Sequence, residues 1–314
     1  MDEYQRALEL LLADPAAQNW PELAASIRRA LVKKPLAWDF PLKACLAVGA
    51  EAERALPGIA AMVCTHMALI LVDDLLDEDP RGEYLKIGAG RAANLAVGLY
   101  ALGVRALQAP RDLAHREQAV TALNDMMQTT AYGQNWDAQN LHSEESYWAV
   151  TRAKSSPYFA TGLFIGALNG GASLDVANGL HNFGSIFGEI MQIHDDLNDC
   201  LASPANVDWL RGRSPLPILF AESVDHPARE RFVNLLNQVT DEEKLREAQS
   251  ILVSCGAISY CVNELLARKD QAQSLLQEIQ LADPQPLQQL LDQTIAPVKH
   301  LFASVGAQFS DVER

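Results

Sequence analysis

The sequence predicts an all-α protein, and three observations carry that prediction. Nearly half of the 314 residues are apolar (49%), with alanine and leucine abundant. Runs of valine, isoleucine and threonine, which favour strands, are nearly absent. An Asp-Asp-x-x-Asp pattern occurs twice, at 73–77 and 195–199, and each copy closes a long apolar stretch typical of a buried helix. We expect one helical domain over residues 1–314, because no linker, low-complexity tract or short repeat divides the chain.

The first half of the chain predicts helices separated by proline and glycine. Residues 2–13 and 21–33 have the pattern of amphipathic helices. A break at 35–41 precedes a short helix to about residue 50, and Pro57 stands near the start of a long helix ending at Leu76. The turn at Arg81-Gly82 leads into a second apolar helix over 89–108.

The second half continues the helical pattern. We expect a helix over 112–131, a polar span over 133–143 and a helix over 144–168. Asn169-Gly170-Gly171 ends that helix, and Ser173 caps the helix that carries the second acidic pattern. An irregular loop over 204–217 and about four further helices complete the chain to about residue 310.

Composition narrows the class of protein. The net charge is −15 and no basic stripe offsets it, so a nucleic-acid partner is excluded. The five cysteines show no metal-ligand spacing and are expected to be free thiols in a reducing cytoplasm. The N-terminus lacks the pattern of a signal peptide. We expect no stable membrane insertion, because the apolar run before Asp73 contains Thr65-His66 and lies between Pro57 and a cluster of acids.

The acidic patterns are unfavourable where they stand. A helix carries partial negative charge at its C-terminal end, and like charges one turn apart, as at Asp73 and Asp77, cost about 0.2–0.5 kcal/mol. A frayed, solvated helix end explains one such pattern as well as a site does. Two copies at the ends of apolar helices point to a cation instead. Carboxylate oxygens suit Mg²⁺, whose coordination is usually completed by water and substrate phosphates.

With both patterns placed, the chain resembles the trans-isoprenyl diphosphate synthases and the related class I terpene synthases, from about residue 35 to about 220. Gly133-Gln134-x-x-Asp137 is similar to the Gly-Gln-x-x-Asp element of that family, and Tyr147 with Lys154-Ser155 is similar to its Tyr…Lys-Thr element. Gln192 matches its Gln-x-x-Asp-Asp. His66 matches a histidine that helps to bind isopentenyl diphosphate in the family. Arg211-Gly212-Arg213-x-x-x-Pro217 resembles its Gly-Lys-x-Thr-Leu-Pro element.

The resemblance implies a single-domain helical bundle of the class I isoprenoid synthase type around a central cavity. It also implies a prenyl diphosphate substrate, a cluster of two or three Mg²⁺ ions and a homodimer. The catalytic residues expected are Asp73, Asp74, Asp77, Asp195, Asp196 and Asp199. All of these except Asp196 are expected to hold the metal. The substrate-binding residues expected are Lys154, Arg81, Gln192, Arg213, His66, Ala68 and Leu69.

The departures from the family pattern bear on the reaction. The segment over 35–41 lacks every cation of the family's Gly-Gly-Lys-Arg-x-Arg-Pro, and Arg81 is alone where two arginines are usual. The missing groups chiefly hold the non-allylic diphosphate in the family. We therefore expect a terpene synthase acting on a C15 or C20 diphosphate, since Ala68 and Leu69 leave room for a long tail. The alternative is a chain-elongating prenyltransferase, or one that prenylates another acceptor. A non-catalytic binding subunit is disfavoured because both acidic patterns are complete.

Overall fold

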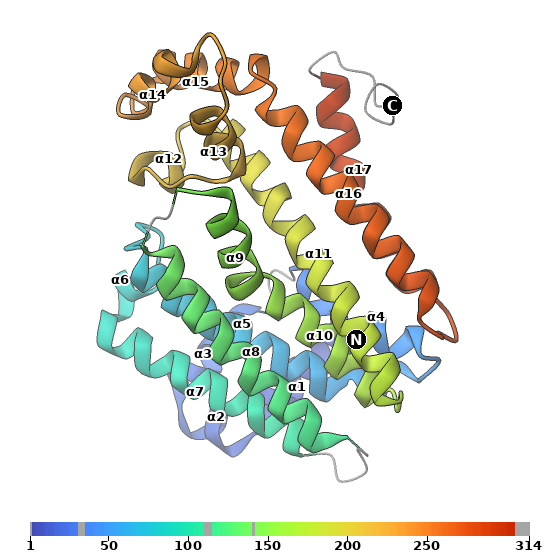
Figure 1. The fold of residues 1–314 in the computed structure, drawn as a ribbon. Coiled ribbons are helices and arrows are strands. Elements are labelled where there is room, and N and C mark those ends of the chain that lie inside the picture. Colours follow the sequence, from blue (N-terminus) through green and yellow to red (C-terminus); the bar gives the residue numbers. More distant parts are fainter. Residues whose placement is uncertain (1, 31–34, 110–114, 140–141, 305–314) are drawn as a thin grey trace. The chain divides into compact units, whose positions relative to one another are not determined.

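The computed structural model describes residues 2–30, 35–109, 115–139 and 142–304, and all regular structure within them is helical (Figure 1). The all-α prediction is therefore confirmed. The chain groups into two compact units, each described here by itself. The first comprises residues 1–131, 157–185 and 275–288, and the second comprises residues 132–156, 186–274 and 289–314. One domain over residues 1–314 stays a prediction.

The first unit is built around α5 (Leu56–Leu76), which packs against α7 (Ala89–Gln108) and α1 (Glu3–Ala13). Eleven of the residues of α5 are buried, on all sides of the helix, as its uniformly apolar sequence predicts. The stretch 52–76 is long and apolar enough to cross a membrane, but 67% of its most apolar window is buried inside the protein. It is thus a core helix of this unit. The other elements that lie wholly in it are α2 (Pro15–Asn19), α3 (Pro21–Ala30), η1 (Leu36–Asp39), α4 (Phe40–Ala47), η2 (Ala52–Ala55) and α6 (Tyr84–Ile87).

The second unit contains the site residues that the sequence analysis predicts after residue 131. Its helices are α9 (Glu144–Lys154), α12 (Val207–Arg211), α13 (Leu216–Ser223), α14 (Arg229–Leu236) and α15 (Glu242–Ser254). Five helices have residues assigned to both units: α8 (Arg116–Asp137), α10 (Ser156–Asn169), α11 (Leu174–Leu201), α16 (Ala257–Glu278) and α17 (Gln285–Ser304).

Most predicted elements are confirmed, and several differ from the structure in their ends or their number. The helices over 57–76 and 89–108 and the one carrying the second acidic pattern lie where they were expected. The predicted polar span over 133–143 begins too early, because α8 continues to Asp137. The helix expected over 144–168 is two helices that meet at Ser155. The loop over 204–217 contains the short helix α12, and in the described part of the chain five helices follow it, close to the four or so expected.

A few predictions fall on residues outside the described ranges. These are the end of the helix predicted over 21–33, the start of the one predicted over 112–131, and the last residues of the predicted C-terminal helix. All five cysteines are free thiols, as predicted; Cys255 is partly exposed and the other four are buried.

Candidate functional site

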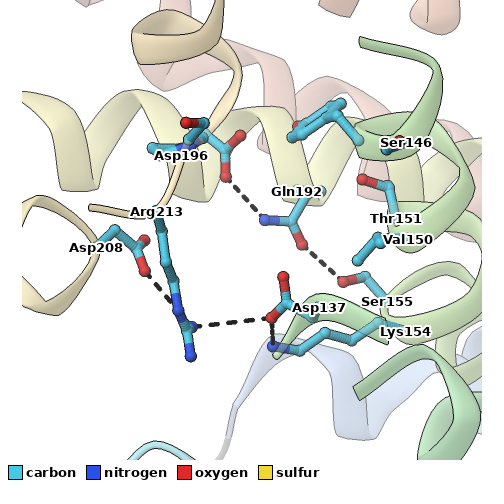
Figure 2. A pocket seen from close by; sticks show the side chains of 13 residues that line it. Asp137, Ser146, Val150, Thr151, Lys154, Ser155, Gln192, Asp196, Asp208 and Arg213 are labelled. Carbon is cyan, nitrogen blue, oxygen red and sulfur yellow. Dashed lines mark hydrogen bonds and ion pairs between the residues drawn. The ribbon is translucent and has the colours of Figure 1, made fainter. Parts of the chain in front are cut away.

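A pocket in the second unit gathers polar side chains from four segments of the chain (Figure 2). Its walls come from the end of α8, from α9, from α11, and from α12 together with the segment that joins it to α13. Lining it are Asp137, Ser146, Tyr147, Val150, Thr151, Lys154, Ser155, Gln192, Asp196, Asp208, Arg213, Ser214 and Pro215. Four of the residues predicted as catalytic or substrate-binding are among them: Lys154, Gln192, Asp196 and Arg213.

Helix α9 ends at the pocket for a local reason. It begins at the cap Ser143, whose hydroxyl accepts a hydrogen bond from the Ser146 amide. It stops at Lys154 because Pro157 has no N–H and cannot continue the i→i−4 hydrogen bonds of the helix. The break turns the chain at Ser155, so Lys154 and Ser155 both face the pocket.

A close approach of two backbones brings Lys154 to Asp137. A Cβ atom added at Gly133 would lie 2.5 Å from the backbone of Ala153 and of Lys154, so only glycine fits where α8 passes the end of α9. The Lys154 ammonium donates to Asp137 Oδ2 over 2.6 Å (Figure 2). This explains the Gly-x-x-x-Asp spacing of the motif: Gly133 admits the neighbouring backbone, and Asp137, one helical turn further on, meets Lys154.

Arg213 enters the pocket from the short helix α12. Asn206 caps the start of α12 by accepting from the Trp209 amide, and Gly212 ends it in the left-handed conformation, with φ of 63°. The next residue, Arg213, extends between two carboxylates, with its guanidinium 3.6 Å from Asp208 and 3.8 Å from Asp137 (Figure 2). Two cations and two carboxylates therefore alternate across this part of the pocket.

Asp208 was not among the residues predicted from the sequence. Its pKa is raised, chiefly by burial and further by the charges of Asp199 and Asp137, against the lowering effect of Arg213. An acid five residues before Arg213, just after the capping Asn206, was the available signal. Without the fold, nothing distinguished Asp208 from a helix-capping or surface acid.

Gln192 and Asp196, both on α11, form hydrogen bonds to the end of α9 and to the start of α13. The Ser155 hydroxyl donates to Gln192 Oε1 over 2.6 Å, and Gln192 Nε2 donates to Asp196 Oδ1 over 2.8 Å (Figure 2). The Leu216 amide, at the start of α13, donates to Asp196 Oδ2 over 2.9 Å. Burial raises the pKa of Asp196 to about 7 despite these hydrogen bonds. Both carboxylate oxygens thus face the protein interior.

The neighbouring acids on α11 face outward. The side chain of Asp195 is 64% exposed, with His194 Nδ1 4.0 Å from its carboxylate, and Asp199 is also exposed. Asp199 lies near enough to Asp208 to raise the pKa of that carboxyl. Exposed carboxylates are the hard oxygen donors that Mg²⁺ takes, so Asp195 and Asp199 fit the predicted metal site. Among the described residues, no three His, Cys, Asp or Glu side chains form a ready-made metal site.

The first acidic pattern lies in the other unit, at the end of α5. The helix ends at Leu76, and Asp77 is its C-cap. The backbone N–H of Asp77 donates to the Asp73 carbonyl over 2.8 Å. Burial raises the pKa of Asp74, and the nearby Asp79 raises it further. Arg81, 83% exposed, makes a bidentate ion pair with Asp79. In this structure Arg81 therefore binds the turn that follows the acidic pattern.

The remaining predicted residues lie on α5. Ala68 is buried and Leu69 is partly buried. His66 Nδ1 accepts a hydrogen bond from the indole Nε1 of Trp38 over 2.7 Å, and the imidazole lies 4.9 Å from the ring of Tyr158. Desolvation lowers the pKa of His66 to about 4, so this imidazole is neutral at pH 7.

Comparison with solved structures identifies the fold. The structure is similar to that of a decaprenyl diphosphate synthase from Rhodobacter capsulatus, with a TM-score of 0.80 and 20% identity over 94% of this chain and 95% of that one. It is also similar to a geranylgeranyl pyrophosphate synthase from Corynebacterium glutamicum, solved with calcium and isoprenyl diphosphate, with a TM-score of 0.78 and 21% identity over 94% of each chain. The fold is that of the isoprenyl diphosphate synthases.

Sequence comparison then gives the family. The sequence profile described as Polyprenyl synthetase matches residues 26–252, so the chain belongs to the polyprenyl synthetase family of prenyl-diphosphate-utilising enzymes. A geranylfarnesyl diphosphate synthase from Aeropyrum pernix is 26% identical over 80% of this chain and 86% of that protein. A geranylgeranyl diphosphate synthase from Methanosarcina mazei is 27% identical over 69% of this chain and 71% of that protein. These relatives carry the names of chain-elongating enzymes.

Proposed function

We propose that this chain is a Mg²⁺-dependent, chain-elongating isoprenyl diphosphate synthase that transfers an allylic prenyl group to isopentenyl diphosphate. The observation that carries the proposal is the set of relatives above, which match most of the chain and have the names of such synthases. They favour the alternative raised by the sequence over the terpene synthase expected first. The terpene synthase was expected because cations are missing at 35–41. The similarity of most of the chain to elongating synthases outweighs that local difference.

The proposed reaction assigns a role to each side of the site. The allylic C–O bond breaks and its electron pair leaves with the diphosphate, which gives an allylic cation. The double bond of isopentenyl diphosphate attacks this cation and forms a C–C bond, and the released diphosphate accepts the proton that is then lost. Lys154 and Arg213 would contact the departing diphosphate, arginine in bidentate fashion. Their present partners, Asp137 and Asp208, hold both cations toward the pocket.

The sequence resemblance implies Asp73, Asp74 and Asp77 on α5 and Asp195 and Asp199 on α11 as the metal ligands, and we keep these five in the proposal. When bound, Mg²⁺ would neutralise the charge that grows on the leaving oxygens. Asp196 is left out of this set, because both of its oxygens accept hydrogen bonds in the interior. A homodimer and a cytoplasmic location remain parts of the proposal, and sedimentation of the purified protein would test the first.

One observation favours a second candidate, a synthase that ionises the allylic diphosphate and quenches the cation internally. The predicted contact of His66 with isopentenyl diphosphate needs an available imidazole. Here the imidazole is neutral, with Nδ1 occupied by the buried Trp38, which stands in the segment where the family has cations. This arrangement offers a second diphosphate little positive charge.

Product analysis separates the two candidates. The purified protein with Mg²⁺ would receive C10, C15 or C20 allylic diphosphates, each with and without isopentenyl diphosphate. Elongation predicts longer prenyl diphosphates, formed only when isopentenyl diphosphate is present. A hydrocarbon or terpene alcohol formed from the allylic substrate alone would support the second candidate and contradict the first.

A further inference from the structure

A buried carboxylate outside the pocket ties α9 to α11 and α16. Glu189, on α11 and only 4% exposed, accepts from Arg152 Nε on α9 over 2.8 Å and from Arg268 Nε on α16 over 2.7 Å. The two bonds use different carboxylate oxygens. We refer to Glu189, Arg152 and Arg268 as the arginine clamp.

The clamp also contacts α9 through an aromatic ring. The Arg268 guanidinium lies 3.7 Å from the centre of the Trp148 ring, and Trp148 is on the same helix as Arg152. Arg268 Nη1 additionally donates to Glu264 on its own helix over 2.7 Å. Arg268 thus links α16 both to α9 and, through Glu189, to α11.

Apart from the clamp, the contacts of helix α9 that involve the pocket lie at its C-terminal end, where Lys154 and Ser155 bond to Asp137 and Gln192. The helix is 11 residues long, a length at which an isolated helix is marginal, and Thr151 is its one buried residue. Apolar packing therefore cannot fix its position along α11. A buried ion pair is weak evidence for stability, since desolvation of the charges offsets their attraction, and its best-attested role is to fix register.

Two residues of the clamp lie close in sequence to residues that line the pocket. Arg152 stands two residues before Lys154, and Glu189 stands three residues before Gln192 on α11. The hydrogen bond between Ser155 and Gln192 forms at the same junction, next to the clamp. A shift of α9 along α11 would move the Lys154 ammonium away from Asp137 and from the phosphate position.

We infer that Glu189 is a positioning residue that, through Arg152 and Arg268, holds Lys154 at the place where a substrate diphosphate binds. The inference rests on the proposed function, because it concerns the diphosphate contact of Lys154. Glu189 lies outside every motif on which the sequence resemblance rests.

The test combines a binding measurement with a mutant cycle. Calorimetry with Mg²⁺ and inorganic diphosphate would compare the wild type, Glu189→Ala, Lys154→Met and the double variant. We expect Glu189→Ala to weaken binding about tenfold, which corresponds to about 1.4 kcal/mol. In the Lys154→Met background the same change should have less than a twofold effect, because the group that it positions is gone. Equal effects in both backgrounds would overturn the inference.

Two further arms separate positioning from general stability. Glu264→Gln is the matched control: it removes another carboxylate partner of Arg268 without freeing α9 from α11, and should leave diphosphate affinity within twofold. Hydrogen exchange of the α9 amides (144–154) should accelerate in Glu189→Ala and not in the control. Unchanged exchange would contradict the clamp. Glu189→Gln, which keeps the shape of the side chain, serves if the alanine variant fails to fold, and is expected to show a smaller effect in the same direction.

The outcomes are distinguishable from failure of the proposed function. If the wild type elongates no prenyl diphosphate but the exchange and diphosphate-binding results hold, the clamp stands and the reaction assigned to the site is wrong. If elongation is observed and the mutant cycle is additive, the function stands and Glu189 has only a structural role.

Discussion

The two acidic patterns share one sequence, Asp-Asp-x-x-Asp, yet the structure gives their residues different surroundings. The first pattern extends past the end of its helix, because α5 ends at Leu76, before the last aspartate. An exposed turn follows, in which Arg81 pairs with Asp79. The second lies inside its helix, since α11 continues to Leu201. The regular helix turns Asp195 and Asp199 outward and Asp196 inward. Three aspartates of one motif can therefore have different functions.

The largest effect should follow loss of an aspartate that is proposed to bind the metal. Asp195→Ala and Asp73→Ala should each lower turnover about a hundredfold or more, because ligands of the metal that stabilises the leaving charge are removed. Steady-state kinetics with saturating Mg²⁺ would measure it, and unchanged far-UV circular dichroism would show that folding is intact. Near wild-type turnover in either variant, or full activity in excess chelator, would contradict the metal assignment.

A smaller loss is expected when a phosphate-binding cation is removed. A hydrogen bond to a charged group contributes about 1.5–3 kcal/mol, so Lys154→Met or Arg213→Met should lower kcat/KM by about one to two decades. The matched control is Arg231→Met, which removes an exposed arginine paired with Glu247 in the same unit and should leave kcat/KM unchanged. Equal effects at the control would mean that the pocket cations have no specific role.

Asp196→Asn sharpens the comparison within the second pattern. The amide oxygen can still accept from Leu216, and the neutral side chain suits a position where burial already raises the pKa to about 7. The bond that Gln192 Nε2 donates is lost, because the amide nitrogen cannot accept it. We expect turnover to fall by less than about tenfold, which is less than 1.4 kcal/mol and far less than for Asp195→Ala. If the two variants were equally inactive, the inward position of Asp196 would not reflect its role.

The last prediction concerns the stability of the fold and its dependence on pH, not turnover. The folded-state pKa of His66, about 4, lies below the ordinary 6.5, so the unfolded chain takes up its proton first as pH falls. The stability that His66 contributes is present above pH 6.5 and is lost between about 6.5 and 4. Wild type should therefore lose about 1–3 kcal/mol more than His66→Asn between pH 8 and 4, a range that allows for partial solvent screening. Comparing the two proteins removes the contribution of Asp196, which both contain. The raised pKa of Asp196 changes stability with pH in the opposite direction. Urea unfolding at each pH would measure the free energy of unfolding. Equal pH dependence in wild type and His66→Asn would mean that the pKa of His66 is not lowered in the folded state.

The fold was predictable from the sequence to a greater extent than the site. The apolar run before Asp73 and the second acidic pattern each predicted a helix, because periodicity and length are local signals. The break at Ser155 was missed: Pro157 stands within an otherwise helical pattern, and proline is tolerated in the first turn of a new helix. Asp208 was missed because, in the sequence, an acid next to a capping residue looks the same as a helix-capping or surface acid. The inward turn of Asp196 depends on the Leu216 amide, 20 residues further along the chain.

The most direct test of the account is the structure of the protein crystallised with Mn²⁺, as an anomalous stand-in for Mg²⁺, and inorganic diphosphate. The account predicts metal bound to Asp195 and Asp199, with phosphate oxygens within hydrogen-bond distance of Lys154 and Arg213. It also predicts that Asp196 keeps its bonds to Gln192 and Leu216. Metal on Asp196, or diphosphate bound away from both cations, would contradict it.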